Sequence, residues 1–297
     1  MTEVHKPRHD IFISYSRKDE EIAKRLNSGL QARGVRTLLD QKDIEPGSFF
    51  EKDIFSLLRT SKCYGILLTP NSLTSKWVSR EYEYARDLHD RGEMRIIPLL
   101  FDTVDLPAGL SSHSVIDFRN KDRWAANLNS LTFPGITGKH LDVWFVNYDW
   151  SKPWALLETR LMREHGALTI IKGDILREWR NGQLANSSDT STRVVAAVDL
   201  FGRPGGDEWR IQESVRFLFE LRESTRAKPN EVVFVLFHDR ASMKANEKTL
   251  SSYLEPAKID RLRFYFYIDK TLGIDELNAD IDATWIKVFQ ELMKMER

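Results

Sequence analysis

Short apolar runs alternate with amphipathic segments along the first 130 residues of the chain. The apolar runs predict buried strands at 10–15, 35–39, 64–68, 95–101 and 115–118. Between them, apolar residues recur at helical spacing, as Ile22, Leu26 and Leu30 do before Gly34. Near-continuous apolar strands that alternate with helices are typical of a parallel sheet covered on both faces. The pattern therefore predicts an α/β domain whose ligands bind at the carboxyl ends of the strands.

One acidic residue interrupts the apolar stripe of the helix that begins near Ser75. Val78, Ala85 and Leu88 form the inward stripe of this helix, and Glu81 lies on the same stripe. A carboxylate at an inward position costs desolvation free energy unless a partner meets it. The residues three and four positions away from Glu81 are not basic, so the helix itself supplies no partner.

Two interpretations of Glu81 are open at this point. It is either a functional carboxylate or a residue at the edge of the stripe that reaches water past Trp77. Glu83 is different, because Arg86 lies three residues further on and indicates an ordinary solvated pair.

Polar side chains occupy the three loops expected at the carboxyl ends of the strands. These loops cover residues 14–19, 40–49 and 70–77. Besides one large aromatic residue, Trp77, they contain the candidate ligand-binding residues Ser14, Ser16, Arg17, Asp43, Glu45 and Ser72. Such a cleft suits a sugar-phosphate ligand with a stackable base. The alternative is that these residues simply form solvated loops.

The composition narrows the class of protein. Lys+Arg and Asp+Glu both total 44, so the chain lacks the basic excess of a nucleic-acid-coating protein and we expect no direct nucleic-acid binding. The single cysteine, Cys63, cannot form an internal disulfide, and we expect a buried thiol. No apolar run approaches the roughly 20 residues of a membrane span, and residues 1–9 lack a signal-peptide core. We therefore expect a cytoplasmic protein without a membrane anchor.

The alternation of strands and helices starts again after residue 140. The turn-rich segment 133–140 is predicted to link a first domain, 8–132, to a second α/β domain, 141–297. Strands are predicted at 141–146, 167–171, 193–198, 232–237 and 262–268, and helices at 153–165, 207–221 and 275–295. The Gly-rich segment 199–206 could hold an anion, although a flexible surface loop is the favoured interpretation because the segment matches no phosphate-binding motif.

Several residues of the first half recur in the second half at a constant spacing along the sequence. Four pairs of like residues stand 132 positions apart: Asp10 and Asp142, Gly34 and Gly166, Trp77 and Trp209, and Glu81 and Glu213. This interval indicates an internal duplication or convergence on one fold. Glu213 is expected to be solvated rather than a second active site, because the apolar stripe of its own predicted helix leaves it off the inner face.

Three motifs in the first half resemble those of the TIR (Toll/interleukin-1 receptor) domain. They are DIFISYS at 10–16, DQKDIEPG at 40–47 and SKWVSRE at 75–81. The resemblance covers about residues 8–132, less than half of the chain, and the C-terminal domain resembles no family that we recognise. It implies a flavodoxin-like fold in which residues 41–47 form the BB loop.

The resemblance also implies a chemistry. In the catalytic, prokaryotic-type members the glutamate of the W-x-x-x-E segment cleaves the nicotinamide-ribose bond of NAD+, and that glutamate maps onto Glu81. The aromatic residue of the segment maps onto Trp77, the polar residues after the first strand onto 14–17, and the BB-loop acid onto Glu45. The seven histidines show no metal-ligand spacing, so we expect NAD+ as a substrate with no metal and no cofactor.

The departing nicotinamide is already cationic, so its loss needs no general acid, and the transition state is a ribosyl oxocarbenium ion. A carboxylate beside the ribose stabilises that positive charge. Attack by water would release ADP-ribose, whereas attack by an internal nucleophile would give a cyclic product, and the sequence leaves both open.

The main hypothesis is therefore an NAD+ glycohydrolase, activated by self-association through its TIR domain, of the kind found among prokaryotic antiviral defence and signalling effectors. The second domain is expected to detect a nucleotide or protein trigger or to mediate assembly. The alternative is a non-catalytic scaffold that recruits other TIR proteins through the BB loop around Pro46 and Gly47. An enzyme should lose turnover when Glu81 is replaced, whereas a scaffold should tolerate that change.

Overall fold

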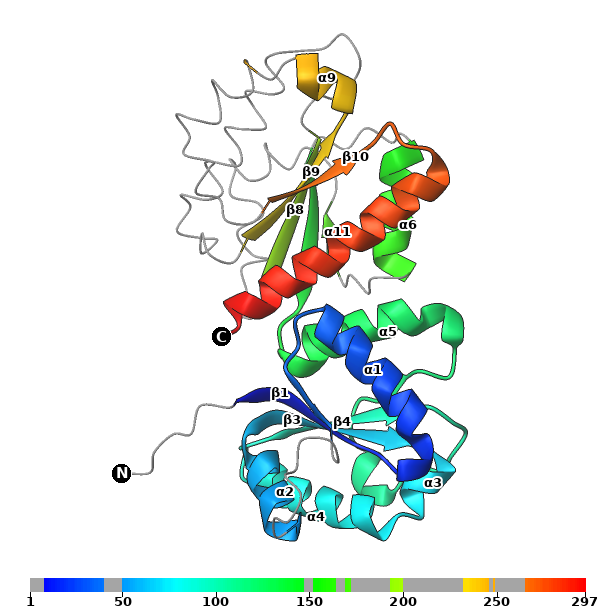
Figure 1. The fold of residues 1–297 in the computed structure, drawn as a ribbon, viewed down its shortest axis with the longest axis vertical. Coiled ribbons are helices and arrows are strands. Elements are labelled where there is room, and N and C mark those ends of the chain that lie inside the picture. The colour runs from blue at the N-terminus through cyan, green and yellow to red at the C-terminus, as the bar shows by residue number, and fades with distance from the viewer. Residues whose placement is uncertain are drawn as a thin grey trace, which may run out of the picture. The chain divides into compact units, whose positions relative to one another are not determined.

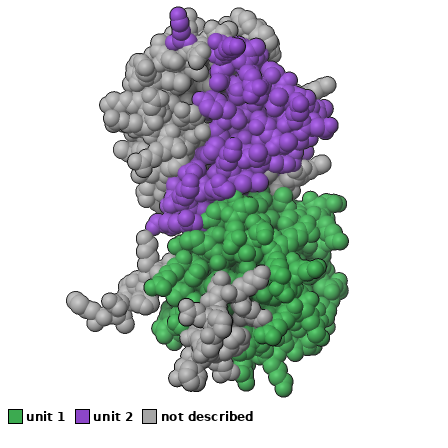
Figure 2. Space-filling view, viewed as in Figure 1, with its two compact units in different colours: residues 1–137 green, residues 138–297 purple. Residues whose placement is uncertain are grey.

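The computed structural model describes residues 8–39, 50–146, 152–163, 169–171, 193–199, 232–245, 248 and 265–297. The chain divides into two compact units, residues 1–137 and 138–297, which Figure 2 draws in green and purple. Each unit contains its own parallel sheet (Figure 1). Within the described ranges, no helix has both the length and the apolar character needed to cross a membrane.

Unit 1 contains a five-stranded parallel sheet. Its strands are β1 (His9–Ser14), β2 (Thr37–Leu39), β3 (Ser61–Leu68), β4 (Arg95–Leu100) and β5 (Ile116–Asp117). They lie in the order β2-β1-β3-β4-β5, and every adjacent pair is parallel. This is the flavodoxin-like order, so the predicted α/β fold is confirmed.

Helices cover both faces of this sheet. They are α1 (Glu20–Ala32), α2 (Phe50–Arg59), α3 (Pro70–Leu73), α4 (Lys76–Asp90) and α5 (Trp124–Ser130). Short 3-10 turns occur at η1 (Arg17–Asp19), η2 (Ala108–Leu110) and η3 (Lys121–Arg123). Figure 1 shows α1 and α5 on one face of the sheet and α2 and α4 on the other.

One local prediction was wrong. Residues 70–77 were predicted as a loop, with a turn at 70–72, but residues 70–73 form the short helix α3. Thr69 caps this helix, since its Oγ1 accepts a hydrogen bond of 3.0 Å from the Ser72 backbone N–H. Pro70 follows at the first helical position, where its missing N–H costs nothing. The Thr69-Pro70 pair is therefore a helix start rather than a turn.

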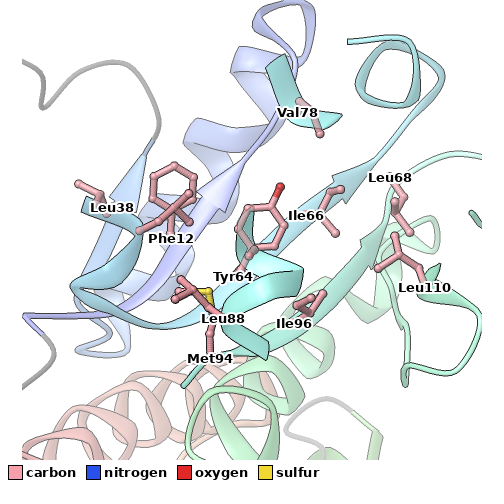
Figure 3. Close-up of a cluster of buried hydrophobic side chains, with 12 residues drawn as sticks. Phe12, Leu38, Tyr64, Ile66, Leu68, Val78, Leu88, Met94, Ile96 and Leu110 are labelled. Carbon is pink, nitrogen blue, oxygen red and sulfur yellow. The ribbon is translucent and has the colours of Figure 1, made fainter. Parts of the chain in front are cut away.

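An apolar cluster fills the space between the sheet and α4 (Figure 3). Alternate residues of β1 and β3 point into it, because side chains along a strand alternate between the two faces. Helix α4 packs its inward stripe on the same cluster. The members from β1, β3 and α4 are Phe12, Tyr64, Ile66, Leu68, Val78, Ala85 and Leu88. This packing sets the height and rotation of α4 over the sheet, and hence the place of any side chain on its inward stripe.

The C-terminal segment of unit 1 contains buried apolar side chains. Residues 131–136 form a helical segment, η4 (Leu131–Ile136), that is kinked at Phe133, whose backbone is extended. Phe133 and Ile136 are buried there, although the sequence pattern suggested a linker beginning at 133. Apolar side chains at these positions bury surface, so the segment belongs to unit 1, which extends to Thr137.

Unit 2 contains a second five-stranded parallel sheet. Its strands are β6 (Leu141–Val146), β7 (Thr169–Ile171), β8 (Arg193–Asp199), β9 (Val232–His238) and β10 (Tyr265–Asp269), in the order β10-β9-β8-β6-β7. The described helices are α6 (Lys152–Arg163), α9 (Arg240–Ala245) and α11 (Ile274–Met295). Arg160 of α6 donates to Asn278 and Asp282 of α11, both at 2.7 Å. The predicted second α/β domain is confirmed, while the predicted helix at 207–221, the loop at 200–206 and Glu213 lie outside the described residues.

The two units share more than a strand order. Counted along the chain, both sheets follow the order second, first, third, fourth, fifth. The starts of β1, α1, β2 and β3 are His9, Glu20, Thr37 and Ser61, and the starts of β6, α6, β7 and β8 are Leu141, Lys152, Thr169 and Arg193, so each second start follows its counterpart by 132 positions. The register agrees too, since His9 pairs with Ser61 and Leu141 with Arg193. The spacing of 132 positions therefore holds for the starts of strands and helices as well as for single residues.

Candidate active site

The carboxyl ends of β1 and β3 form the centre of the candidate site. These two strands are adjacent at the point where the strand order of unit 1 reverses. Ligands of doubly wound sheets bind at this switch point, because the connections on its two sides run to opposite faces and leave a crevice. The chain leaves β1 through η1 and leaves β3 through α3, so residues 14–19 and 69–76 border the crevice.

Glu81 reaches this site from α4. The helix begins at Ser75, whose Oγ accepts a hydrogen bond of 3.4 Å from the Val78 backbone N–H. Its buried residues are Val78, Glu81, Ala85 and Leu88, as the sequence pattern predicted. The side chain of Glu81 is 0% exposed. The interpretation of Glu81 as a stripe-edge residue that reaches water is therefore wrong.

Ser14 is a hydrogen-bond partner of this buried carboxylate. It lies two residues beyond Phe12, so the alternation of the strand points both side chains toward α4. The Oγ of Ser14 donates a short hydrogen bond to Oε2 of Glu81. Ser14 is itself fully buried. A neutral hydroxyl lowers the cost of burying the carboxylate without cancelling its charge.

Asp19 is a second buried acid at the same edge of the sheet, and the sequence analysis did not select it. Its Oδ2 accepts hydrogen bonds from Thr69 Oγ1 at 2.6 Å and from Ser72 Oγ at 3.4 Å. Its Oδ1 accepts from Asn71 Nδ2 at 2.8 Å. The sequence signal that was available is its position at the end of the short polar loop between a predicted strand and a predicted helix.

The other candidate residues lie at different depths. Ser72 is buried and its Oγ accepts from the Ser16 backbone N–H at 3.3 Å, so its hydroxyl is engaged within the protein. Ser16 borders the buried region, Arg17 is exposed, and Trp77 is half-buried against the apolar cluster. The structure thus pairs Ser14 with Glu81 and Ser16 with Ser72, while Asp43 and Glu45 lie outside the described residues.

A comparison with protein-family models identifies the first half of the chain. The model described as "TIR domain" matches residues 11–132. Residues 11–132 form a TIR domain. The match begins inside β1 and ends inside η4, so it spans the whole sheet of unit 1 and includes Ser14, Asp19 and Glu81.

Two known proteins are similar in sequence to part of the chain. "Stimulator of interferon genes protein" of Magallana gigas is 30% identical over 120 residues, which cover 37% of this chain and 29% of that protein. "NAD(+) hydrolase PdTIR" of Paracoccus denitrificans (strain Pd 1222) is 28% identical over 94 residues, which cover 31% of each. The chain therefore spans less than a third of the length of these relatives.

Solved structures of TIR proteins are also similar to the chain. The crystal structure of the TIR domain of the Toll-related receptor TRR-2 from Hydra magnipapillata is 22% identical, with a TM-score of 0.37, over 41% of this chain and 94% of that one. The structure of a metazoan TIR-STING receptor from C. gigas is 14% identical, with a TM-score of 0.37, over 100% of this chain and 99% of that one.

The TIR domain offers carboxylate chemistry more readily than thiol chemistry. Burial raises the pKa of the Cys63 thiol to about 11, which suppresses the nucleophilic thiolate and confirms the predicted buried thiol. Among the residues that the structure describes, no group of three His, Cys, Asp or Glu side chains could hold a metal ion. Ser14 bonds the buried carboxylate of Glu81, and Thr69, Asn71 and Ser72 bond that of Asp19, so two buried acids lie at this edge of the sheet.

Proposed function

We propose that the TIR domain cleaves the bond between nicotinamide and ribose in NAD+. The observation that carries this proposal is the fully buried Glu81, bonded by Ser14 at the switch point of the sheet. A carboxylate in a dry site acts strongly on a nearby positive charge, because water does not screen the interaction.

In the proposed reaction, the bond between C1′ of the ribose and the nicotinamide nitrogen breaks. The bonding pair passes to the pyridinium nitrogen and neutralises it, while positive charge develops on the ribose. The Glu81 carboxylate stabilises this oxocarbenium-like state and accepts hydrogen bonds from the ribose hydroxyls. Water then adds to C1′ and loses a proton, so the products are nicotinamide, ADP-ribose and H+. Capture by an internal nucleophile of the ADP-ribosyl group would give a cyclic product by the same first step.

The sequence relative named as an NAD(+) hydrolase supports this choice of substrate. That relative is 28% identical to the chain over 94 residues. The proposal extends to assembly: self-association of TIR domains gates the activity, and the second unit receives the trigger or mediates the contact.

The test is release of nicotinamide from NAD+ by the purified chain, followed by chromatography with and without a crowding agent. The Glu81→Gln variant keeps the shape of the side chain and its ability to accept from Ser14 Oγ, but it removes the charge. We expect turnover to fall by about 100-fold or more, the usual cost of removing an electrostatic stabiliser.

The matched control is Glu83→Gln, an exposed residue of the same helix. This variant should release nicotinamide at the wild-type rate, because its carboxylate faces solvent. The nucleotide left in solution identifies hydrolysis or cyclisation. Equal turnover of Glu81→Gln and wild type would contradict the proposal, and no release even under crowding would favour the non-catalytic scaffold.

A further inference from the structure

Asp19 occupies a helix-capping position but does not cap its helix. It is the residue before Glu20, where α1 begins, and Asp at this position usually accepts a hydrogen bond from a backbone N–H of the first turn. Here the carboxylate makes no such bond. Ordinary helix capping therefore does not account for its conformation.

The carboxylate of Asp19 instead bonds a segment that lies 50 residues further along the chain. Its donors are Thr69 at 2.6 Å, Asn71 at 2.8 Å and Ser72 at 3.4 Å. All three donors are neutral, and Asp19 is only 6% exposed. A buried carboxylate bonded on both oxygens is held in one orientation, because every alternative leaves a charged group without donors.

This contact joins the two segments that carry Ser14 and Glu81. On one side, Ser14 ends β1, and Asp19 lies five residues further on in the connection to α1. On the other side, residues 69–72 lead through Ser75 into α4, which carries Glu81. A second bond, from the Ser16 backbone N–H to Ser72 Oγ at 3.3 Å, closes the connection between the two segments.

We infer that Asp19 is a positioning residue that sets Ser14 against Glu81. The inference rests on the proposed function, and it adds a residue that acts through the two segments and not on the substrate. Displacement of reacting groups by about 1 Å can cost about 100-fold in rate. The hydrogen bonds between Asp19 and residues 69–72 are here called the clamp. Loosening this clamp should therefore slow the chemical step more than it weakens the binding of NAD+.

The test compares kcat and KM for nicotinamide release by wild type and Asp19→Asn. The amide has the same shape but only one acceptor oxygen, so it cannot accept both from Asn71 and from Thr69 and Ser72. We expect kcat to fall by about 10- to 100-fold and KM to change by less than about two-fold. Glu21→Gln, an exposed acid on the first turn of α1, is the control and should match wild type.

A second variant keeps the inference testable if Asp19→Asn folds poorly. Asn71→Ala removes one donor from a half-buried side chain and should lower kcat by a smaller factor. The double variant should be less impaired than the product of the single effects, because both changes break the same contact. Unchanged kcat in folded Asp19→Asn or Asn71→Ala would overturn the inference and leave Asp19 a merely stabilising residue.

Amide hydrogen exchange separates this inference from the proposed function. Asp19→Asn should raise the exchange of residues 14–18 and 71–76, whether or not the chain turns over NAD+, since loosening the clamp opens both segments. Wild type without turnover would overturn the proposed function alone. Unchanged amide exchange in Asp19→Asn would overturn the inference that Asp19 holds the two segments together.

Discussion

At the scale of single residues, the candidate site is centred on Glu81, a carboxylate that interrupts the apolar stripe of its helix. Glu81 stands where an apolar side chain is expected, and the structure buries it completely. Burial of a charge is tolerated only with hydrogen-bond donors, and Ser14 provides one. The burial of Glu81 therefore both costs desolvation free energy and supports its interpretation as a functional carboxylate.

The Ser14→Ala variant should lower kcat by about ten-fold. A hydrogen bond to a charged group contributes roughly 1.5–3 kcal/mol, and about 1.4 kcal/mol corresponds to a factor of ten in rate. Its loss should also lower the free energy of unfolding by a similar amount, because the carboxylate keeps its burial. Nicotinamide release and urea denaturation measure the two effects. Ser79→Ala, on the exposed side of α4, is the control, and equal kcat in both variants would argue against a role for the Ser14 hydroxyl.

At the scale of elements, β1 and β2 are joined by an ion pair at the opposite end of the sheet from the site. Asp10 opens β1 and accepts from the Arg36 backbone N–H at 2.9 Å, from Arg36 Nε at 3.1 Å and from Arg36 Nη2 at 2.8 Å. The Asp10 N–H in turn donates to the Arg36 carbonyl at 2.7 Å. These contacts set the start of the parallel pair before the strands reach the site.

This pair should make the stability of unit 1 sensitive to acid. Burial by itself raises the pKa of Asp10, but the hydrogen bonds and charge of Arg36 outweigh it and hold the pKa below its ordinary value of 3.8. Because the folded value is the lower one, the contribution of Asp10 is present above pH 3.8 and is lost as pH falls through the folded value. Asp10→Asn should lower the free energy of unfolding by about 1.5–3 kcal/mol at neutral pH.

The difference between Asp10→Asn and wild type should shrink as the pH falls below 3.8. Urea denaturation at a series of pH values measures it, and Asp87→Asn on the exposed face of α4 is the control. A difference that stayed constant down to the lowest pH would show that the charge of Asp10 contributes nothing to stability.

At the scale of the whole molecule, each unit contains its own parallel sheet, and unit 1 has its own apolar core. Two sheets with one strand order, and four elements at an interval of 132 positions, indicate that one architecture is used twice. A shared fold does not imply a shared site, because function depends on the residues that the fold carries. A catalytic role for Glu81 in unit 1 therefore does not imply an acid with the same role in unit 2.

Residues 1–137 should fold without the second unit. Cys63, the single cysteine of the chain, lies at 0% exposure in the core of unit 1 and reports on its folding. Burial raises the pKa of its thiol to about 11, so iodoacetamide should not label it at pH 8 in the folded protein. Mass spectrometry should detect labelling of the fragment and of the full chain only when urea unfolds unit 1. Rapid labelling of the fragment without urea would show that unit 1 depends on residues after 137.

The sequence by itself determined the alternation of strands and helices, the inward position of Glu81 and the interval between the halves. These features depend on local periodicity and on spacing, both of which can be read from neighbouring positions. Even the correction at α3 was local, since Thr69 and Pro70 together form a helix start.

Tertiary structure alone decided which polar residues meet. Ser14 bonds a residue 67 positions away, and Asp19 bonds three side chains 50 to 53 positions away. Nothing in the neighbourhood of Asp19 in the sequence distinguishes it from an ordinary helix cap. Its role depends on the adjacency of β1 and β3, which brings the two connecting segments side by side, and on burial, which makes each donor to the carboxylate necessary.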